Sequence, residues 1–101
     1  MDRFAIWSRM EVKPGKEQKL EEFLKYAQSL IEQELGTTTF YALKVGPNTY
    51  STFDTFADEA ARDAHVNGPV AKALLARVDE LFTQAPEIIQ TTIIGAKISN
   101  T

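Results

Sequence analysis

The amino-acid sequence predicts an α+β fold of the ferredoxin-like type, in which two helices pack on one face of a four-stranded antiparallel sheet. Four segments have the alternation of apolar residues, or the content of β-branched and aromatic residues, that is typical of strands. Two others repeat apolar residues at steps of three or four, as amphipathic helices do. These segments follow one another in the order β-α-β-β-α-β, which is the order of the ferredoxin-like motif.

The first strand is predicted over residues 4–13, where the even-numbered positions are mostly apolar and Ser8 interrupts them, and a Pro-Gly pair ends it. The first helix is predicted over residues 16–35. Its apolar stripe consists of Leu20, Phe23, Leu24, Ala27, Leu30, Ile31 and Leu35. Gly36 follows directly, and we predict that it closes this helix in the left-handed conformation.

The middle of the chain predicts a hairpin and then a broken helix. Residues 37–45 and 49–56 are rich in β-branched and aromatic residues, and a short Gly-Pro-Asn turn joins them. Asp58 can cap the helix that comes next, because its side chain can accept a hydrogen bond from the first turn. This helix is predicted over residues 60–66 and resumes over residues 69–82 after an Asn-Gly-Pro interruption.

The last predicted element is a strand over residues 87–98, which are dense in Ile and Thr. The chain has 101 residues, which is the size of one domain, and no internal repeat or linker divides it. We therefore predict a single domain over residues 1–101.

The composition excludes several classes of protein. The sequence has no cysteine, which rules out disulfides and thiolate metal sites, and one histidine alone does not make a usual zinc site. The net charge is −3, and no clustered basic face is visible, so neither nucleic acid nor an anionic membrane is an expected partner. No apolar stretch reaches the 18 residues or so that span a bilayer. We therefore expect a soluble, cytoplasmic protein without a metal site.

One face of the predicted sheet has no cover. Trp7 alternates with the residues that would face the helices, and several strands are apolar on both sides. A sheet that is apolar on both faces needs a layer on each of them, and two helices supply only one layer. The sequence therefore predicts a homodimer in which a second copy of the chain covers the other face.

Four stretches of the sequence resemble the antibiotic biosynthesis monooxygenase superfamily. The first is the end of the first strand with its turn, residues 10–16, and the second is the start of the hairpin, residues 39–43. The third is an aromatic-rich strand that continues through an acidic residue into the next helix, residues 51–61. The fourth is the Ala-His pair at residues 64–65, which precedes a break made of small residues. The resemblance covers nearly the whole domain. It implies a dimeric α/β barrel, with a cavity between sheet and helices in each subunit.

The resemblance also implies an activity. The oxygenases of this superfamily usually need no cofactor, because the deprotonated, electron-rich substrate reduces dioxygen directly. We therefore predict a cofactor-independent monooxygenase acting on a quinol-like or polycyclic aromatic small molecule. Two alternatives stay open, which are a non-catalytic ligand-binding or stress-response dimer of the same fold and an isomerase of a small metabolite.

Five residues are candidates for the site. His65 is the single histidine and titrates near neutral pH, so it is the predicted catalytic base. Ser8 could present a hydroxyl to the cavity, although its hydroxyl could equally bond to the backbone. Asp54, beside Phe53, could form a structural ion pair with Arg9 or act as a base. Asn67 could line the pocket mouth or cap a helix. Substrate binding is therefore predicted for Ser8, Phe53, Asp54 and Asn67.

Overall fold

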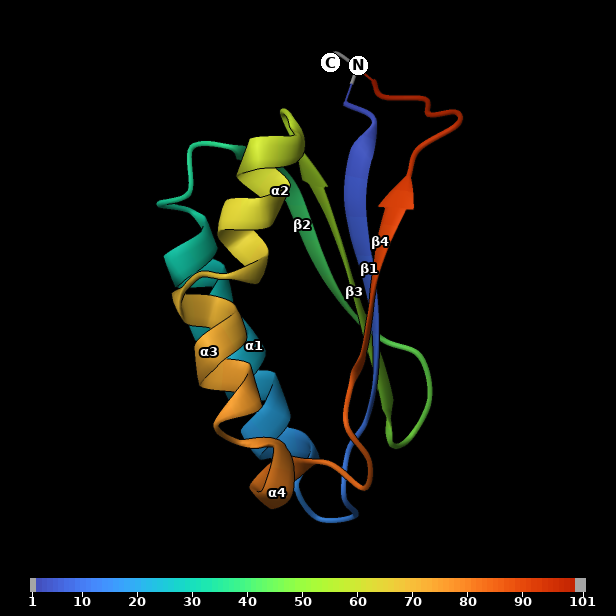
Figure 1. The fold of residues 1–101 in the computed structure, drawn as a ribbon. Helices are drawn as coiled ribbons and strands as arrows, with labels where there is room; N and C mark the ends of the chain where they lie inside the picture. The colour runs from blue at the N-terminus through green and yellow to red at the C-terminus, as the bar shows by residue number, and fades with distance from the viewer. Residues whose placement is uncertain (1, 100–101) are drawn as a thin grey trace.

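The computed structural model describes residues 2–99, and these residues form one antiparallel sheet covered by helices on one side (Figure 1). The elements are β1 (Phe4–Glu11), α1 (Glu17–Ile31), β2 (Thr37–Lys44), β3 (Thr49–Phe56), α2 (Glu59–Val66), α3 (Pro69–Leu75), α4 (Val78–Leu81) and β4 (Glu87–Thr92). The strand order is β2-β3-β1-β4, and each neighbouring pair is antiparallel. The predicted ferredoxin-like fold is therefore confirmed.

The first helix ends earlier than predicted, and Gly36 has a different role. Helix α1 stops at Ile31, and turns lead from there into β2. Among the described residues, only Gly15 has a positive φ, at 89°, so the prediction of a left-handed cap at Gly36 was wrong. A side chain at Gly36 would place its Cβ 2.4 Å from the Cβ of Ala61. Gly36 is therefore needed for close packing of this turn against α2.

The second helical region begins as predicted and then divides further. The Asp58 side chain accepts a hydrogen bond of 2.8 Å from the N–H of Ala61, which caps α2. Pro69 lies in the first turn of α3, where its missing N–H leaves no helical bond unmade. The single helix predicted over residues 69–82 is two helices, because the chain leaves helical geometry between α3 and α4.

The final strand is shorter than the predicted span of residues 87–98. Thr92 at the end of β4 pairs with Phe4, the first residue of β1, and the N–H of Ile93 still bonds to the carbonyl of Arg3 at 2.8 Å. From Ile93 to Ser99 the chain is no longer a strand. Ile94 is consequently almost fully exposed.

The core lies between the sheet and the helices. Alternate residues of β1 point toward the helices and pack against the apolar stripe of α1. Val70 of α3, Leu81 of α4 and Phe82, which directly follows α4, pack in the same layer. The buried residues of this core are Met10, Val12, Leu20, Phe23, Leu24, Ala27, Ile31, Tyr50, Val70, Leu81 and Phe82. The helix-facing side of the sheet is therefore the side that holds any internal cavity.

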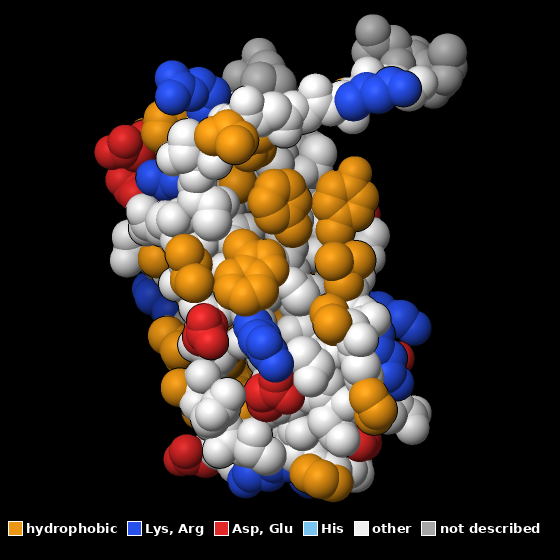
Figure 2. All heavy atoms as spheres, turned by 90° about the vertical axis from the view of Figure 1, so that its right-hand side faces the viewer, with side chains coloured by type: hydrophobic (Ala, Val, Ile, Leu, Met, Phe, Trp, Pro, Cys, Tyr) orange, Lys and Arg blue, Asp and Glu red, His pale blue; other side chains and the backbone are white. Residues whose placement is uncertain are grey.

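The other side of the sheet carries a row of apolar side chains that no helix covers. The strand register aligns Tyr41, Phe53, Trp7 and Ile89 across all four strands, and we call these four residues the outer row. Tyr41 is 56% exposed and Ile89 is 43% exposed. Figure 2 shows apolar side chains gathered on this face. The bare apolar face is thus as predicted, whereas the dimer remains a prediction.

Candidate active site

A cavity of about 290 Å³ lies between the sheet and the helices. Its wall is mostly apolar, with Phe23 and Ile31 of α1, Phe40 of β2 and Leu74 of α3 among its lining residues. A few polar side chains also reach this wall, and they are Ser8, Thr52, Asp54, His65 and Gln90. A mostly apolar pocket with a few convergent polar groups is the usual form of a small-molecule site.

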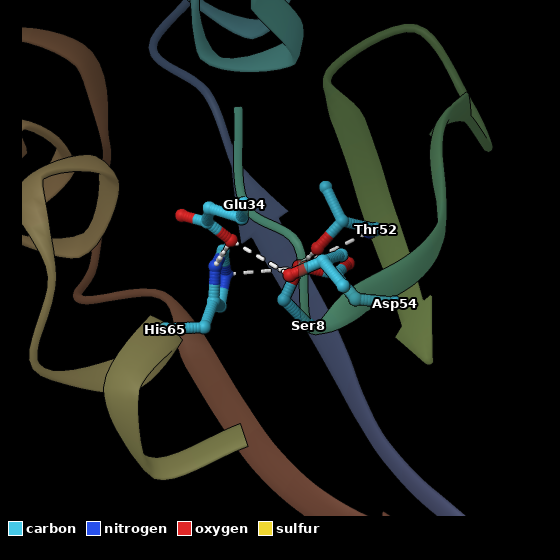
Figure 3. A network of polar contacts seen from close by, with 6 residues as sticks. Ser8, Glu34, Thr52, Asp54 and His65 are labelled. Atoms are coloured by element: carbon cyan, nitrogen blue, oxygen red, sulfur yellow. Dashed lines mark hydrogen bonds and ion pairs between the residues drawn. The ribbon is translucent and has the colours of Figure 1, made fainter. Parts of the chain in front are cut away.

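The central strands place three of these polar groups side by side. Ser8 of β1 pairs with Thr52 of β3, and Asp54 follows Thr52 on the same, helix-facing side of β3. The Ser8 hydroxyl contacts the Thr52 hydroxyl and accepts a hydrogen bond of 3.0 Å from the Thr52 N–H (Figure 3). The backbone bonding considered for Ser8 is therefore present, while its side chain also lines the cavity.

His65 of α2 lies between two carboxylates. Its Nδ1 is 2.8 Å from Oε1 of Glu34, and its Nε2 is 3.2 Å from Oδ2 of Asp54 (Figure 3). The Phe56 ring packs against the imidazole, with ring centroids 5.3 Å apart. Because both ring nitrogens have carboxylate partners, neither of them is free to take a proton from a molecule in the cavity.

The protonation of this cluster follows from its burial and its partners. Loss of hydration would by itself lower the pKa of His65, but the hydrogen bonds and charges of Asp54 and Glu34 outweigh that loss and raise the pKa above its ordinary value. Burial raises the pKa of Asp54, although the nearby imidazole acts in the opposite direction. The cluster therefore holds its imidazole in the protonated form more firmly than an exposed histidine would.

Asp54 supplies the free acceptor of the site. It is only 3% exposed, and its Oδ1 has no hydrogen-bond partner among the described residues. A buried carboxylate oxygen normally accepts at least one hydrogen bond, since leaving it unpaired costs free energy. Oδ1 is thus a ready acceptor for a hydroxyl or N–H of a molecule in the cavity that Asp54 lines.

The structure brings together three of the five predicted site residues, and they are Ser8, Asp54 and His65. Phe53 belongs to the outer row, on the opposite face of the sheet from the cavity. Asn67 is the C-cap of α2, and its amide donates a hydrogen bond of 2.9 Å to the Asp63 carbonyl. Neither Phe53 nor Asn67 lines the cavity, because side-chain alternation directs Phe53 outward and the cap bond holds Asn67 at the surface.

Asp54 does not form the ion pair with Arg9 that the sequence analysis left open. Arg9 lies on the outer face of β1 and pairs with Glu11, with 2.9 Å between nitrogen and oxygen. Asp54 points to the helix side and pairs with His65 instead. The alternative of an ion pair between Asp54 and Arg9 was therefore wrong, because the two side chains project from opposite faces of the sheet.

Three polar residues of the site, Thr52, Gln90 and Glu34, were not among the candidates. Thr52 could have been found, because it lies two residues before Asp54 on a strand and must share its face. Glu34 gave no such signal, since the sequence placed it on the polar side of a helix running to residue 35. Within residues 2–99, no three His, Cys, Asp or Glu side chains are arranged to hold a metal ion.

The sequence of residues 3–77 matches the family described as antibiotic biosynthesis monooxygenase. The chain belongs to this family. No curated protein matches the sequence. Among solved structures, the crystal structure of a protein of unknown function from Nitrosomonas europaea is 44% identical in sequence and has a TM-score of 0.92. The match covers all of this chain and 98% of that chain.

A second solved structure, a candidate antibiotic biosynthesis monooxygenase from Caulobacter crescentus, has a TM-score of 0.79. It is 18% identical, with 93% of this chain and 92% of that chain covered, so it supports the fold alone. Family membership and fold therefore agree, and neither names a substrate. Within residues 2–99, no helix has both the length and the apolar character needed to cross a bilayer.

Proposed function

We propose that this protein is a cofactor-independent monooxygenase that oxidises a small hydroxylated aromatic compound in the cavity lined by Asp54 and His65. The observation that carries the proposal is the unpaired Oδ1 of Asp54, a buried acceptor on a residue that lines a mostly apolar pocket. An aromatic ring suits the apolar wall, and its hydroxyl would donate to Oδ1. Membership of the monooxygenase family supports the oxidative chemistry.

The volume of the cavity limits the size of the substrate. Pockets for drug-sized ligands usually measure roughly 300–1,000 Å³, and this one, at about 290 Å³, lies just below that range. A quinol-like molecule with one or two fused rings is therefore favoured over a larger polycyclic one. The mostly apolar wall lowers the polarity around Asp54, which strengthens the interaction of Asp54 with a substrate hydroxyl.

The reaction balances without an added reductant. The phenolic hydroxyl gives its proton to Oδ1 of Asp54, and an electron-rich ring carbon ortho or para to that hydroxyl, one that carries a hydrogen atom, forms a bond with dioxygen. Loss of the hydrogen on that carbon and cleavage of the O–O bond leave a quinone carbonyl. The second oxygen atom leaves as water, so that one phenol and one dioxygen give one quinone and one water. Before this transfer, the hydrogen bond and positive charge of His65 lower the pKa of Asp54 and so favour the ionised carboxylate that accepts the proton.

Oxygen uptake tests this proposal. Wild-type protein with a metal chelator is supplied with hydroquinones, naphthols, dihydroxynaphthalenes and anthrones, and we expect uptake with the one- and two-ring compounds above all. Asp54→Asn should lower turnover by roughly 10²-fold or more, because the amide cannot take the proton. Asp63→Asn is the matched control, since Asp63 is an exposed residue of α2. No uptake by wild type with any compound would contradict the proposal and favour the ligand-binding alternative.

We also propose that a second copy of the chain covers the outer row. The row is apolar across all four strands, and such a face is stable in water only when another layer packs on it. Arg9 and Glu11 form an ion pair on the same face, and a pair of opposite charges is self-complementary across a two-fold axis. Sedimentation at micromolar concentration should give about twice the chain mass of 11.3 kDa. A monomer under these conditions would contradict the proposal.

A further inference from the structure

His65 lies in a wall between two hollows. On one side is the cavity described above, which Asp54 lines and Glu34 does not. On the other side is a second, more open hollow, which Glu34 lines and Asp54 does not. His65 lines both of them. The three side chains therefore connect the inside of the cavity to the outer surface through a single imidazole.

The three groups form a continuous chain of close contacts. The Asp54–His65 contact is 3.2 Å and the His65–Glu34 contact is 2.8 Å, both short enough for proton transfer along a hydrogen bond. The exposed fraction of the side chains rises along this chain, from 4% at Asp54 through 11% at His65 to 23% at Glu34. The outer end of the chain is thus the end that meets water.

The local packing fixes Glu34 in this position. The Thr37 hydroxyl donates a hydrogen bond of 2.7 Å to the same Oε1 that contacts His65. Gly36 lets the turn approach α2, since a Cβ there would lie 2.4 Å from the Cβ of Ala61. The N–H of Ala57 bonds to the Gly36 carbonyl at 2.9 Å. The turn after α1 is therefore attached to α2 at the level of His65.

We propose that Glu34, His65 and Asp54 form a proton relay that links the cavity to solvent, with Glu34 as its outer end. The proposal rests on the proposed function, because the relay carries the proton of the substrate hydroxyl. When that proton arrives at Oδ1 of Asp54, the Nδ1 proton of the imidazolium passes to Oε1 of Glu34. The positive charge of His65 is thereby moved outward as Asp54 is neutralised, and the total charge of substrate and relay is unchanged.

The relay runs in the reverse direction to complete the reaction. The proton on Asp54 goes to the oxygen atom that leaves as water, and the proton on Glu34 returns to Nδ1 of His65. While the proton resides on Glu34 it exchanges with water in the outer hollow. Glu34 acts through His65 and does not touch the substrate.

Glu34→Gln tests the relay during turnover. Gln keeps a polar group beside His65 and Thr37 but does not carry a proton, so turnover should fall by roughly 10-fold or more with KM unchanged. A small buffer such as imidazole should restore the rate as its concentration rises, while wild type should not respond. Glu32→Gln is the matched control on the exposed side of the same turn. An unchanged rate, or a lowered rate that no buffer restores, would overturn the relay.

A second measurement needs no substrate and separates the relay from the proposed function. His65 is the single histidine, so its ring N–H signals in ¹⁵N-labelled protein are assigned directly by NMR. Exchange of its Nδ1 proton with solvent should be slower in Glu34→Gln than in Glu32→Gln. Equal or faster exchange would overturn the relay whether or not any substrate is oxidised. If exchange slows but wild type oxidises no compound, the proposed function fails and the relay stands.

Discussion

The two faces of the sheet use polar and apolar residues in opposite ways. On the helix-facing side, the polar residues Ser8 and Asp54 are buried within a layer that is otherwise apolar core. On the outer side, Tyr41 and Ile89 remain exposed although they are apolar. Buried polar groups cost free energy unless they are paired, and exposed apolar groups cost free energy unless they are covered. Buried polar residues on one face and exposed apolar residues on the other are both features expected where a protein binds another molecule.

The departures point to different partners. On the inner side the unpaired atom is one carboxylate oxygen, which fits a single donor on a small molecule. On the outer side the outer row extends across the full width of the sheet, which fits a surface of similar shape and size. If this comparison is right, a substitution on one face should leave the property of the other face unchanged.

The largest effect is expected for His65→Ala. Loss of the imidazole leaves the carboxylates of Asp54 and Glu34 without the cation between them, so turnover of a phenolic substrate should fall by roughly 10²-fold or more. Steady-state oxygen uptake measures this loss, and sedimentation should still give the mass of a dimer.

Asn67→Ala is the control for His65→Ala. Asn67 follows the same helix but lies outside the cavity lining, so turnover should stay at the wild-type level. An unchanged rate in His65→Ala would contradict a role of His65 in the reaction. A loss of dimer in the same variant would contradict the independence of the two faces.

A smaller effect is expected on the outer face. Tyr41→Ala removes a ring from the outer row, and the dimer should weaken by roughly 5–30-fold in Kd, which corresponds to about 1–2 kcal/mol. Tyr26→Ala is a close control, because Tyr26 of α1 is 55% exposed and Tyr41 is 56% exposed. Sedimentation over a range of concentrations measures both constants. Equal weakening by the two substitutions, or none by either, would show that the outer row is not the interface.

The residues of the outer face of the sheet can be predicted from the sequence more completely than those of the inner face. Alternation along a strand separates Trp7 and Phe53 from Ser8 and Asp54, so the outer row follows from the pattern once the strands are aligned. Phe53 precedes Asp54 directly and therefore projects from the opposite face of β3, away from the cavity. The inner face could be predicted as far as Ser8, Asp54 and His65, because polar residues in apolar surroundings stand out in a sequence.

Glu34 was beyond this reasoning for a physical reason. Its contact with His65 joins residues 31 positions apart and depends on where α1 ends. Helix propensity does not mark that end, since Glu and Gln residues continue past Ile31 and suit a helix equally well. The turn after α1 approaches Ala61 closely at Gly36, and a single sequence does not reveal which surface a glycine approaches.

The smallest effect is expected in the pH dependence of stability. The pKa of His65 is raised in the folded protein, where Asp54 and Glu34 are the charged groups that face it. The imidazole therefore contributes stability that is fully present below its ordinary pKa, about 6.5, and is lost as pH rises through the folded-state pKa. Urea unfolding of wild type and His65→Gln at a series of pH values from about 5.5 to 9 measures this contribution, and the difference in unfolding free energy should shrink as pH rises. Asp54, whose pKa is raised by burial, is present in both proteins, so its own titration is part of both unfolding curves. A difference that stays constant or grows with pH would mean that His65 is held neutral, and then neither its cationic role nor the outward shift of its proton would be possible.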